Sequence, residues 1–298
     1  MHRVIIDNVK VLIAKPYGYC AGVANAINLA HKTKQANPNR KIVILGMLIH
    51  NDDALKDLEK MGIETIYQKD CDLLDLIDVI RDNSIVILTA HGHKKEVESK
   101  LKERGLEYVD TTCLFVNLTF SEIAKSVKDN HDVIYIGKNH HPEANAALAI
   151  SSHVHLLDVS NPVVPDIKDE SPLIINQTTF SHFEIERLIG LIKAKYPHAR
   201  VFKSVCDAST KRQQALLDLP KDVELIYVVG GKNSNNAKTL FDLASKHFPT
   251  AKVLAIQNEN DVKEKDLDGL NLVAISSGAS TPKEISEAIK AKIESLCN

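Results

Sequence analysis

The sequence contains no long apolar run and little excess charge of either sign. No stretch of about 18 apolar residues occurs, and the first residues lack the apolar core and small-residue cleavage site of a signal peptide. The formal net charge is −2 with 26% charged residues, so no global basic field indicates a nucleic-acid partner. These absences predict a cytoplasmic protein with no membrane or nucleic-acid partner.

Several common cofactor motifs are also absent. The segment GGKNSNN lacks the G-x-G-x-x-G pattern of a dinucleotide site, no Walker sequence is present, and no C-x-x-C pair marks a structural zinc site. In a reducing compartment, the five cysteines are expected to be ligands or thiols rather than disulfides.

What the chain does contain is a regular alternation of two patterns. Short β-branched runs alternate with amphipathic stretches of helical periodicity, and the continuous apolar runs are typical of parallel strands buried on both faces. The order predicts an α/β fold. The expected strands are 10–14, 41–46, 84–92, 132–137, 172–179, 224–231 and 270–278, and the expected helices include 51–62, 95–105, 182–197, 237–249 and 282–296.

Three of the cysteines are evenly spaced. Cys20, Cys113 and Cys206 follow one another at intervals of 93 residues, and each stands between a β-branched run and a helix-like stretch. This predicts three similar α/β modules, 10–112, 113–205 and 206–298, arranged as a pseudo-threefold trefoil around a central cavity. A cysteine that opens a helix lies where backbone N–H groups and the helix dipole favour the thiolate, the form that binds metal.

Three converging thiolates leave more than one metal open. They can hold zinc with a histidine or water as fourth ligand, or a 4Fe-4S cluster with one iron free to bind a substrate. A site without metal is the third alternative.

Polar residues recur after equivalent strands of each module. After the second strand of the first, second and third modules come, in that order, His50; His141 with Glu143; and Ser234, Asn235 and Asn236. After the last strand of each module come, in the same order, His91, Thr178 and Ser280. Ligands of open α/β sheets bind beyond the carboxyl ends of the strands. A ring of such donors suits a phosphorylated ligand.

Seven motifs in order carry a family resemblance: YGYCAGV, TAHGH, DTTC, HHPE, NQTT, GGKNSNN and SSGAS. From about Lys10 to about Lys283 the chain resembles the LytB/IspH family of 4-hydroxy-3-methylbut-2-enyl diphosphate reductases. The resemblance implies a 4Fe-4S oxidoreductase of isoprenoid biosynthesis that converts this allylic diphosphate into isopentenyl and dimethylallyl diphosphates. It also implies that Cys20, Cys113 and Cys206 are the cluster ligands. A two-electron reduction through such a cluster needs a ferredoxin or flavodoxin-type electron donor.

Site roles follow from residue chemistry together with this resemblance. Three histidines offer N–H donors to a diphosphate, and five neutral side chains can bond phosphate oxygens. Glu143 is expected to be a general acid, and Thr178 to relay the proton or orient the hydroxyl. The alternative for Glu143 is a helix cap after Pro142. The expected diphosphate-binding residues are His50, His91, His141, Thr178, Ser234, Asn235, Asn236 and Ser280.

Several positions depart from the family pattern. Tyr17 stands where Arg is common, Leu114 where Pro is usual and Asp207 where an aromatic residue is frequent, while Asn235 replaces a common Ser. Asp52 and Asp53 add negative charge after His50. A divergent homologue reducing another allylic diphosphate is therefore an alternative, as are a non-catalytic metal or iron-sulfur sensor of a phosphorylated metabolite and a zinc hydrolase.

Overall fold

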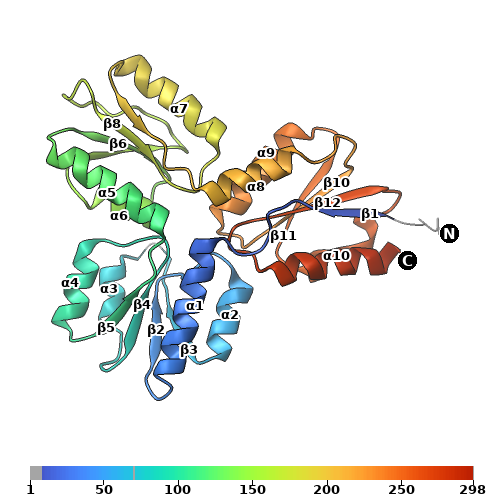
Figure 1. Ribbon diagram of the computed structural model, residues 1–298, viewed down its shortest axis with the longest axis horizontal. Coiled ribbons are helices and arrows are strands. Elements are labelled where there is room, and N and C mark those ends of the chain that lie inside the picture. The colour runs from blue at the N-terminus through green and yellow to red at the C-terminus, as the bar shows by residue number, and fades with distance from the viewer. Residues whose placement is uncertain (1–8, 70, 298) are drawn as a thin grey trace. The chain divides into compact units, whose positions relative to one another are not determined.

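The computed structural model describes residues 9–69 and 71–297, and these form three four-stranded sheets in which every pairing is parallel. Helices flank each sheet, as Figure 1 shows. The predicted α/β class is confirmed. Among the described residues, no helix has both the length and the apolar content to cross a membrane.

The chain divides into two compact units. One holds residues 9–21, 50–54 and 207–297, and the other holds 22–49 and 55–206 except residue 70, which is not described. The second unit contains two of the sheets. They are β3-β2-β4-β5, formed by β2 (Ile42–Leu45), β3 (Ile63–Ile66), β4 (Ile85–Leu88) and β5 (Glu107–Asp110), and β7-β6-β8-β9, formed by β6 (Val133–Gly137), β7 (Val154–Asp158), β8 (Leu173–Asn176) and β9 (Arg200–Phe202).

The first unit contains the sheet β1-β12-β10-β11, built from β1 (Lys10–Ile13), β10 (Leu225–Val229), β11 (Lys252–Ile256) and β12 (Leu272–Ser277). Alternate residues of β10 enter opposite cores: Tyr227 packs in the core that includes Ile289 of α10 (Lys283–Cys297), and Ile226 in the core that includes Leu240 of α9 (Asn235–His247). The strand is therefore buried on both faces, which explains its continuous apolar run.

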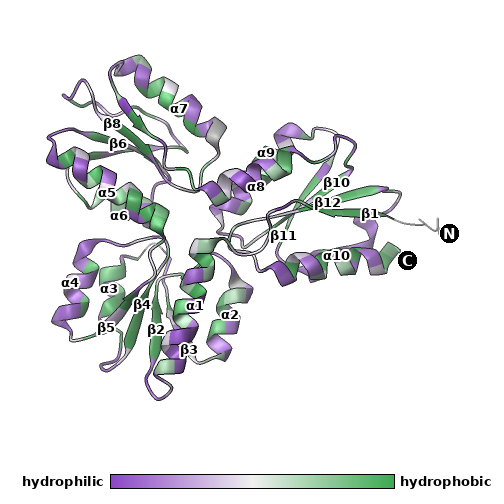
Figure 2. Cartoon of the chain, in the orientation of Figure 1, coloured by the Kyte–Doolittle hydropathy of each residue, from purple (hydrophilic) through white to green (hydrophobic). Residues whose placement is uncertain are grey.

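The remaining elements are helices that follow the strands. They are α1 (Ala21–Ala36), α2 (Asp52–Lys60), α3 (Leu73–Ile77), α4 (Lys95–Glu103), α5 (Leu114–Lys128), α6 (Pro142–Leu148), α7 (His182–Lys195), α8 (Asp207–Leu217), α9 (Asn235–His247) and α10 (Lys283–Cys297), with short 3-10 turns η1 (Glu259–Asp261) and η2 (Glu264–Asp266). Figure 2 shows apolar strands and helices that combine polar and apolar residues.

One strand pairs differently from the prediction. The first module was expected to begin at residue 10, but β1 pairs with β12 of the C-terminal segment, with Lys10 opposite Leu272 and Ile13 opposite Ile275. The other edge of β12 pairs with β10, so β12 becomes a central strand whose six residues are all buried. Burial of this apolar strand accounts for the recruitment of β1. The remaining module boundaries stay a prediction.

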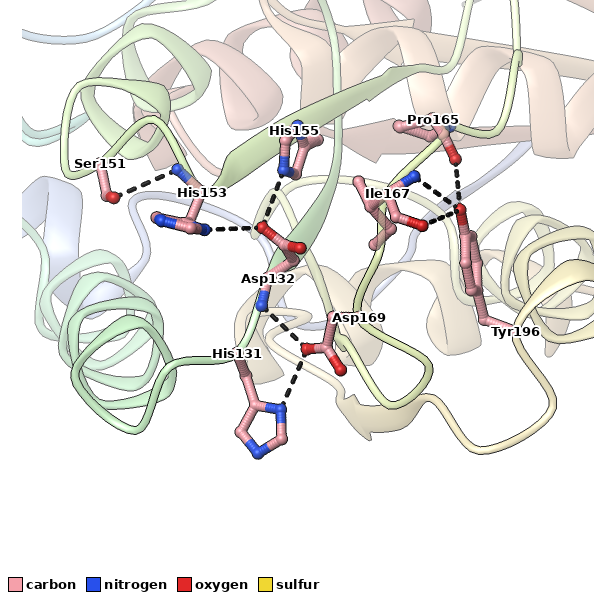
Figure 3. A network of polar contacts seen from close by, with 9 residues as sticks. All are labelled: His131, Asp132, Ser151, His153, His155, Pro165, Ile167, Asp169 and Tyr196. Carbon is pink, nitrogen blue, oxygen red and sulfur yellow. Dashed lines mark hydrogen bonds and ion pairs between the residues drawn. The ribbon is translucent and has the colours of Figure 1, made fainter.

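A network of imidazoles and carboxylates lies at the amino end of β6 (Figure 3). Asp132 Oδ1 accepts hydrogen bonds from His153 Nδ1 at 2.9 Å and His155 Nε2 at 3.1 Å. Asp169 Oδ2 accepts from the Asp132 backbone N–H at 2.9 Å and from His131 Nδ1 at 3.0 Å. This network joins the residues before β6 to the beginning of β7 and to the segment before β8.

These hydrogen bonds set the proton affinity of both carboxylates. Partial burial pushes the pKa of Asp132 up, but the hydrogen bonds from His155 and His153 outweigh it and leave this pKa below its ordinary value. The pKa of Asp169 is also lowered: burial opposes the shift, and bonds from Ser171, His131 and Asp132 exceed it. Both side chains are therefore ionised at neutral pH.

Candidate active site

All three predicted cysteine ligands share one backbone arrangement. Each directly precedes a helix, and each donates its backbone N–H to a carbonyl in the loop that follows a central strand. The three pairs are Cys20 with Ala279 at 3.0 Å, Cys113 with Ala90 at 3.1 Å and Cys206 with Thr178 at 2.9 Å. Each accepting carbonyl belongs to a predicted binding residue or to the residue before it. Ala279 precedes Ser280, Ala90 precedes His91, and Thr178 is itself a predicted binding residue.

The donor set suits an iron-sulfur cluster. All three cysteines are half-buried, so the thiols are partly shielded from water without being sealed in a core. Each stands at the start of a helix, where the dipole and backbone N–H groups favour a thiolate. Soft thiolates at such positions are the ligands that iron-sulfur clusters require. Cys113 and Cys206 belong to the second unit and Cys20 to the first.

Glu143 is fixed in a buried position at the start of α6. Pro142 occupies the first turn of the helix, and His141 at the N-cap accepts a hydrogen bond on Nδ1 from the Glu143 backbone N–H at 3.2 Å. Proline favours this first turn because its fixed φ suits the helix and it needs no N–H partner there. The cap and Pro142 thus fix the local backbone, and the Glu143 side chain is only 1% exposed.

Three donors hold the Glu143 carboxyl group. Oε1 accepts from the Thr178 backbone N–H at 2.9 Å and the Tyr135 hydroxyl at 3.2 Å, and Oε2 accepts from the Thr178 hydroxyl at 3.0 Å. Burial raises the pKa of Glu143 from 4.5 to about 7, although these hydrogen bonds oppose the shift. A carboxyl group with this pKa can both hold and release a proton near neutral pH, as a general acid must.

His91 and His141 lie together in the second unit. Their rings make an edge-to-face contact with centroids 5.7 Å apart. Because Nδ1 of His141 accepts a hydrogen bond, the proton of the neutral ring is on Nε2, which makes that nitrogen a donor. The structure thus brings His91 to His141 and Thr178 to Glu143, residues that follow the strands β4, β6 and β8.

The first unit brings together His50, Ser280 and Gly231. The Ser280 hydroxyl donates to the His50 carbonyl at 3.2 Å. A Cβ at Gly231 would lie 2.5 Å from the same carbonyl oxygen, so only glycine permits this approach. The loop after β10 therefore packs against the backbone of His50.

Ser234 and the two residues after it begin α9. Ser234 is the N-cap and accepts from the Ala237 backbone N–H at 3.3 Å, which gives this buried residue a capping role as well as the predicted binding role. Asn236 Oδ1 accepts from the Ser209 hydroxyl at 2.6 Å. Asn235 Nδ2 is buried and has no hydrogen-bond partner within the part of the chain that the structure describes, so it is available to a ligand.

The departures from the family pattern lie in different settings. The Tyr17 hydroxyl donates to Glu287 at 3.1 Å, and Leu114 is 69% exposed at the start of α5. Asp207 forms an ion pair with Lys211 at 2.7 Å, which offsets its added charge. Asp53 accepts a hydrogen bond from the Asn258 amide at 3.3 Å. The side chain of Asp52 lies outside what the structure describes.

Two residues of the site were not predicted from the sequence. Tyr135 holds Glu143, and its pKa stays well above the ordinary value because of burial and the nearby Glu143, so the phenol remains a donor. A hydroxyl-bearing residue inside the aliphatic run of β6 was the available signal. Arg212 of α8 is buried and bonds to the Gly18 carbonyl at 2.6 Å; the sequence offered no pattern for it.

Comparison with known proteins agrees with the motifs. A family model described as LytB protein matches residues 11–294. The chain is 33% identical over 281 residues to 4-hydroxy-3-methylbut-2-enyl diphosphate reductase of Malacoplasma penetrans, covering 92% of this chain and 93% of that protein. Its identity to the reductase of Bacillus subtilis is 35% over 284 residues, covering 94% of this chain and 88% of that protein.

Solved structures give the same result. The E-1-hydroxy-2-methyl-but-2-enyl-4-diphosphate reductase from Plasmodium falciparum is similar with a TM-score of 0.85 at 28% identity, covering 98% of this chain and 89% of that chain. A structure of (E)-4-hydroxy-3-methyl-but-2-enyl diphosphate reductase has a TM-score of 0.66 at 25% identity, covering 96% and 99%. The family match extends over nearly the whole chain, and this protein therefore belongs to the LytB family.

Proposed function

We propose that this protein reduces 4-hydroxy-3-methylbut-2-enyl diphosphate to isopentenyl and dimethylallyl diphosphates. The reaction consumes two electrons and two protons and releases the allylic hydroxyl as water. Membership of the LytB family and the names of its relatives support this substrate. The structural observation that carries the proposal is the buried Glu143 carboxyl with a pKa of about 7, beside a threonine whose carbonyl holds Cys206.

Cys20, Cys113 and Cys206 are the residues that would hold the 4Fe-4S cluster. When bound, this cluster would supply the electrons and one iron without a cysteine ligand. The chain's contribution is to fix each thiol through its backbone bond to the loop after a central strand. We infer a ferredoxin or flavodoxin-type protein as the electron source, because the sequence lacks the fingerprints of flavin and nicotinamide sites. The cytoplasmic location stays a prediction from the sequence.

Glu143 supplies the proton that makes water the leaving group. As the C–O bond of the allylic alcohol breaks, the carboxyl group transfers its proton to the departing oxygen, so hydroxide is never released. Thr178 can orient this step, since its hydroxyl and its backbone N–H bond to the two oxygens of the carboxyl group. The carboxylate left behind remains hydrogen-bonded to three donors until it is protonated again.

The remaining predicted residues would bind the diphosphate. Imidazole and amide N–H groups and serine hydroxyls can donate to phosphate oxygens without placing a permanent charge in the empty site. His141 offers Nε2 and Asn235 offers Nδ2, as their observed contacts indicate. The proposed set is His50, His91, His141, Thr178, Ser234, Asn235, Asn236 and Ser280.

Anaerobic purification followed by iron, sulfide and activity measurements tests the proposal. We expect a brown protein with about four irons per chain that oxidises a reduced dye when the allylic diphosphate is added. Replacement of Cys113 by Ser should lower the iron content, whereas replacement of Cys71, which lies outside the evenly spaced set, should not. Colourless anaerobic protein, or substrate binding without dye oxidation, would contradict the proposal.

A further inference from the structure

We propose that Arg212 is a positioning residue that ties the turn before Cys20 to the first turn of the helix after Cys206. The inference deepens the proposed function, since its value to the protein depends on two of the cysteines holding the cluster. Arg212 touches neither substrate nor reacting atoms in this account. It acts through the backbone segments that carry the thiols.

The contacts of Arg212 define the tie. Its side chain is buried, with the residue only 4% exposed. Nη2 donates to the Gly18 carbonyl at 2.6 Å, and Nη1 donates to the Ala208 carbonyl at 3.1 Å. Gly18 lies two residues before Cys20, and Ala208 lies two residues after Cys206. One guanidinium therefore bonds to carbonyls that flank two proposed ligands.

The turn before Cys20 is one that needs support. Gly18 has φ +86°, and an added Cβ there would lie 3.1 Å from the Cβ of Lys283, so the turn requires glycine. Glycine is also the residue that loses most conformational freedom on ordering. The bond from Arg212 fixes the turn on one side of Cys20, and the Cys20 N–H bonded to Ala279 fixes the other.

The chemistry of arginine fits this role better than that of lysine. A guanidinium is planar and presents several N–H donors in a fixed fork, so it can bond two carbonyls in a set relative orientation. The ammonium group of lysine carries the same charge but lacks this fixed arrangement of N–H donors. Arg212 is also a permanent buried cation that bonds to the turn before Cys20 and lies on the helix after Cys206, and a cation so placed favours the more negative, reduced state of an anionic centre.

Two variants separate geometry from charge, and one variant provides a matched control. Arg212→Gln removes both charge and fork, whereas Arg212→Lys removes only the fork. Arg104 is the control, because its Nη1 and Nη2 donate to the carbonyls of Ile77 at 3.1 Å and Ile80 at 3.0 Å, neither of which flanks a proposed cysteine ligand. Arg104→Gln thus removes a comparable pair of bonds to backbone carbonyls, together with an ion pair to Asp82 at 3.0 Å.

Hydrogen–deuterium exchange measures the tie without requiring a cluster. In anaerobically purified protein, both Arg212 variants should speed amide exchange in residues 17–20 by about tenfold, because loss of a charge-assisted bond costs that much in local stability. Arg104→Gln should leave residues 17–20 unchanged. Unchanged exchange in Arg212→Gln, or an equal increase in Arg104→Gln, would overturn the inference.

The iron content and the midpoint potential give the second readout. Both Arg212 variants should retain less iron than wild type; the potential should fall in Arg212→Gln but stay near the wild-type value in Arg212→Lys, which keeps the charge. Faster exchange together with wild-type iron content and potential would reduce Arg212 to a structural role and overturn the positioning role. If wild-type protein binds no iron, the proposed function fails, while the exchange experiment still decides whether the tie exists.

Discussion

Two acidic side chains near opposite ends of strand β6 have pKa values shifted in opposite directions. At the amino end, Asp132 accepts hydrogen bonds from two imidazoles and its pKa lies below the ordinary value. Beyond the carboxyl end, Glu143 is fully buried among neutral donors and its pKa is raised to about 7. Hydrogen-bond partners that can carry a positive charge lower the pKa of a carboxyl group, whereas burial among neutral groups raises it.

This difference suits Asp132 to a structural role and Glu143 to the proposed proton transfer. The network around Asp132 joins three chain segments and needs its negative charge at neutral pH. Glu143 lies at the end of the sheet where ligands of α/β proteins bind, and its protonated form is available there. Substitutions at each end of β6 test this difference.

The largest expected effect is on turnover. Glu143→Gln should lower kcat at least 100-fold, because an amide cannot transfer a proton, while the visible spectrum of the protein stays as in wild type. Asp132→Asn is the control and should leave kcat unchanged. Steady-state oxidation of a reduced dye measures both. Wild-type turnover in Glu143→Gln would remove this residue from the chemistry.

A second effect concerns the free energy of unfolding as a function of pH. Because the folded state raises the pKa of Glu143 from 4.5 to about 7, it binds more protons than the unfolded state in that window. The free energy of unfolding should therefore decrease as pH rises through the window, by about 3 kcal/mol in total.

Glu143→Gln provides the reference for this measurement. Its amide oxygen can still accept from Thr178 and Tyr135, but it does not titrate, so this decrease should be absent from the variant. Urea unfolding at pH 5 and pH 8 compares the two proteins. Equal changes in wild type and variant would show that Glu143 titrates at its ordinary pKa.

The hydroxyl of Thr178 should make a smaller contribution. Thr178→Val removes the bond to Oε2 but keeps the backbone N–H and carbonyl, so the ionised form of Glu143 loses one donor and its pKa should rise further. The basic limb of the pH–rate profile should move to higher pH, and kcat at the optimum should fall about tenfold. Thr178→Ser keeps the hydroxyl and should match wild type. A Val variant with the wild-type profile would contradict the role given to the hydroxyl.

The smallest effect is expected at the amino end of β6. Asp132→Asn should lower the free energy of unfolding by about 1 kcal/mol at pH 7, since two partly exposed hydrogen bonds lose their ionised acceptor. A carboxylate with a lowered pKa stabilises the fold above its unfolded pKa and loses that effect as pH falls through the folded value. The difference between the variant and wild type should therefore shrink as pH falls below about 4, the ordinary pKa of aspartate. Urea titrations at pH 7 and pH 3 test this, and a difference as large at pH 3 as at pH 7 would point to packing instead of charge.

The sequence predicted the fold class because the central strands carry continuous apolar runs, such as Ile42–Leu45 and Ile85–Leu88, that only a sheet covered on both faces explains. The partner of β1 was not predictable in the same way. A four-residue apolar strand fits the edge of any parallel sheet, and its choice of β12 depends on contacts between residues more than 250 positions apart.

The candidate site was predictable where residue type and position coincide. Cysteines and polar residues after strands marked the loops, and the structure holds each cysteine next to one of those loops. Tyr135 and Arg212 were missed for physical reasons. A tyrosine within a strand is normally part of the core, and an arginine in a polar helix is normally a solvated charge, so only tertiary packing distinguishes them.

Infrared spectroscopy of the Glu143 carbonyl decides whether this side chain holds a proton near neutral pH. The difference spectrum of wild type minus Glu143→Gln should contain the C=O band of a protonated carboxyl group at pH 5.5, and this band should disappear with a midpoint near pH 7. If the band is already absent at pH 5.5, Glu143 is an ordinary ionised carboxylate, and the account of it as the proton donor is wrong.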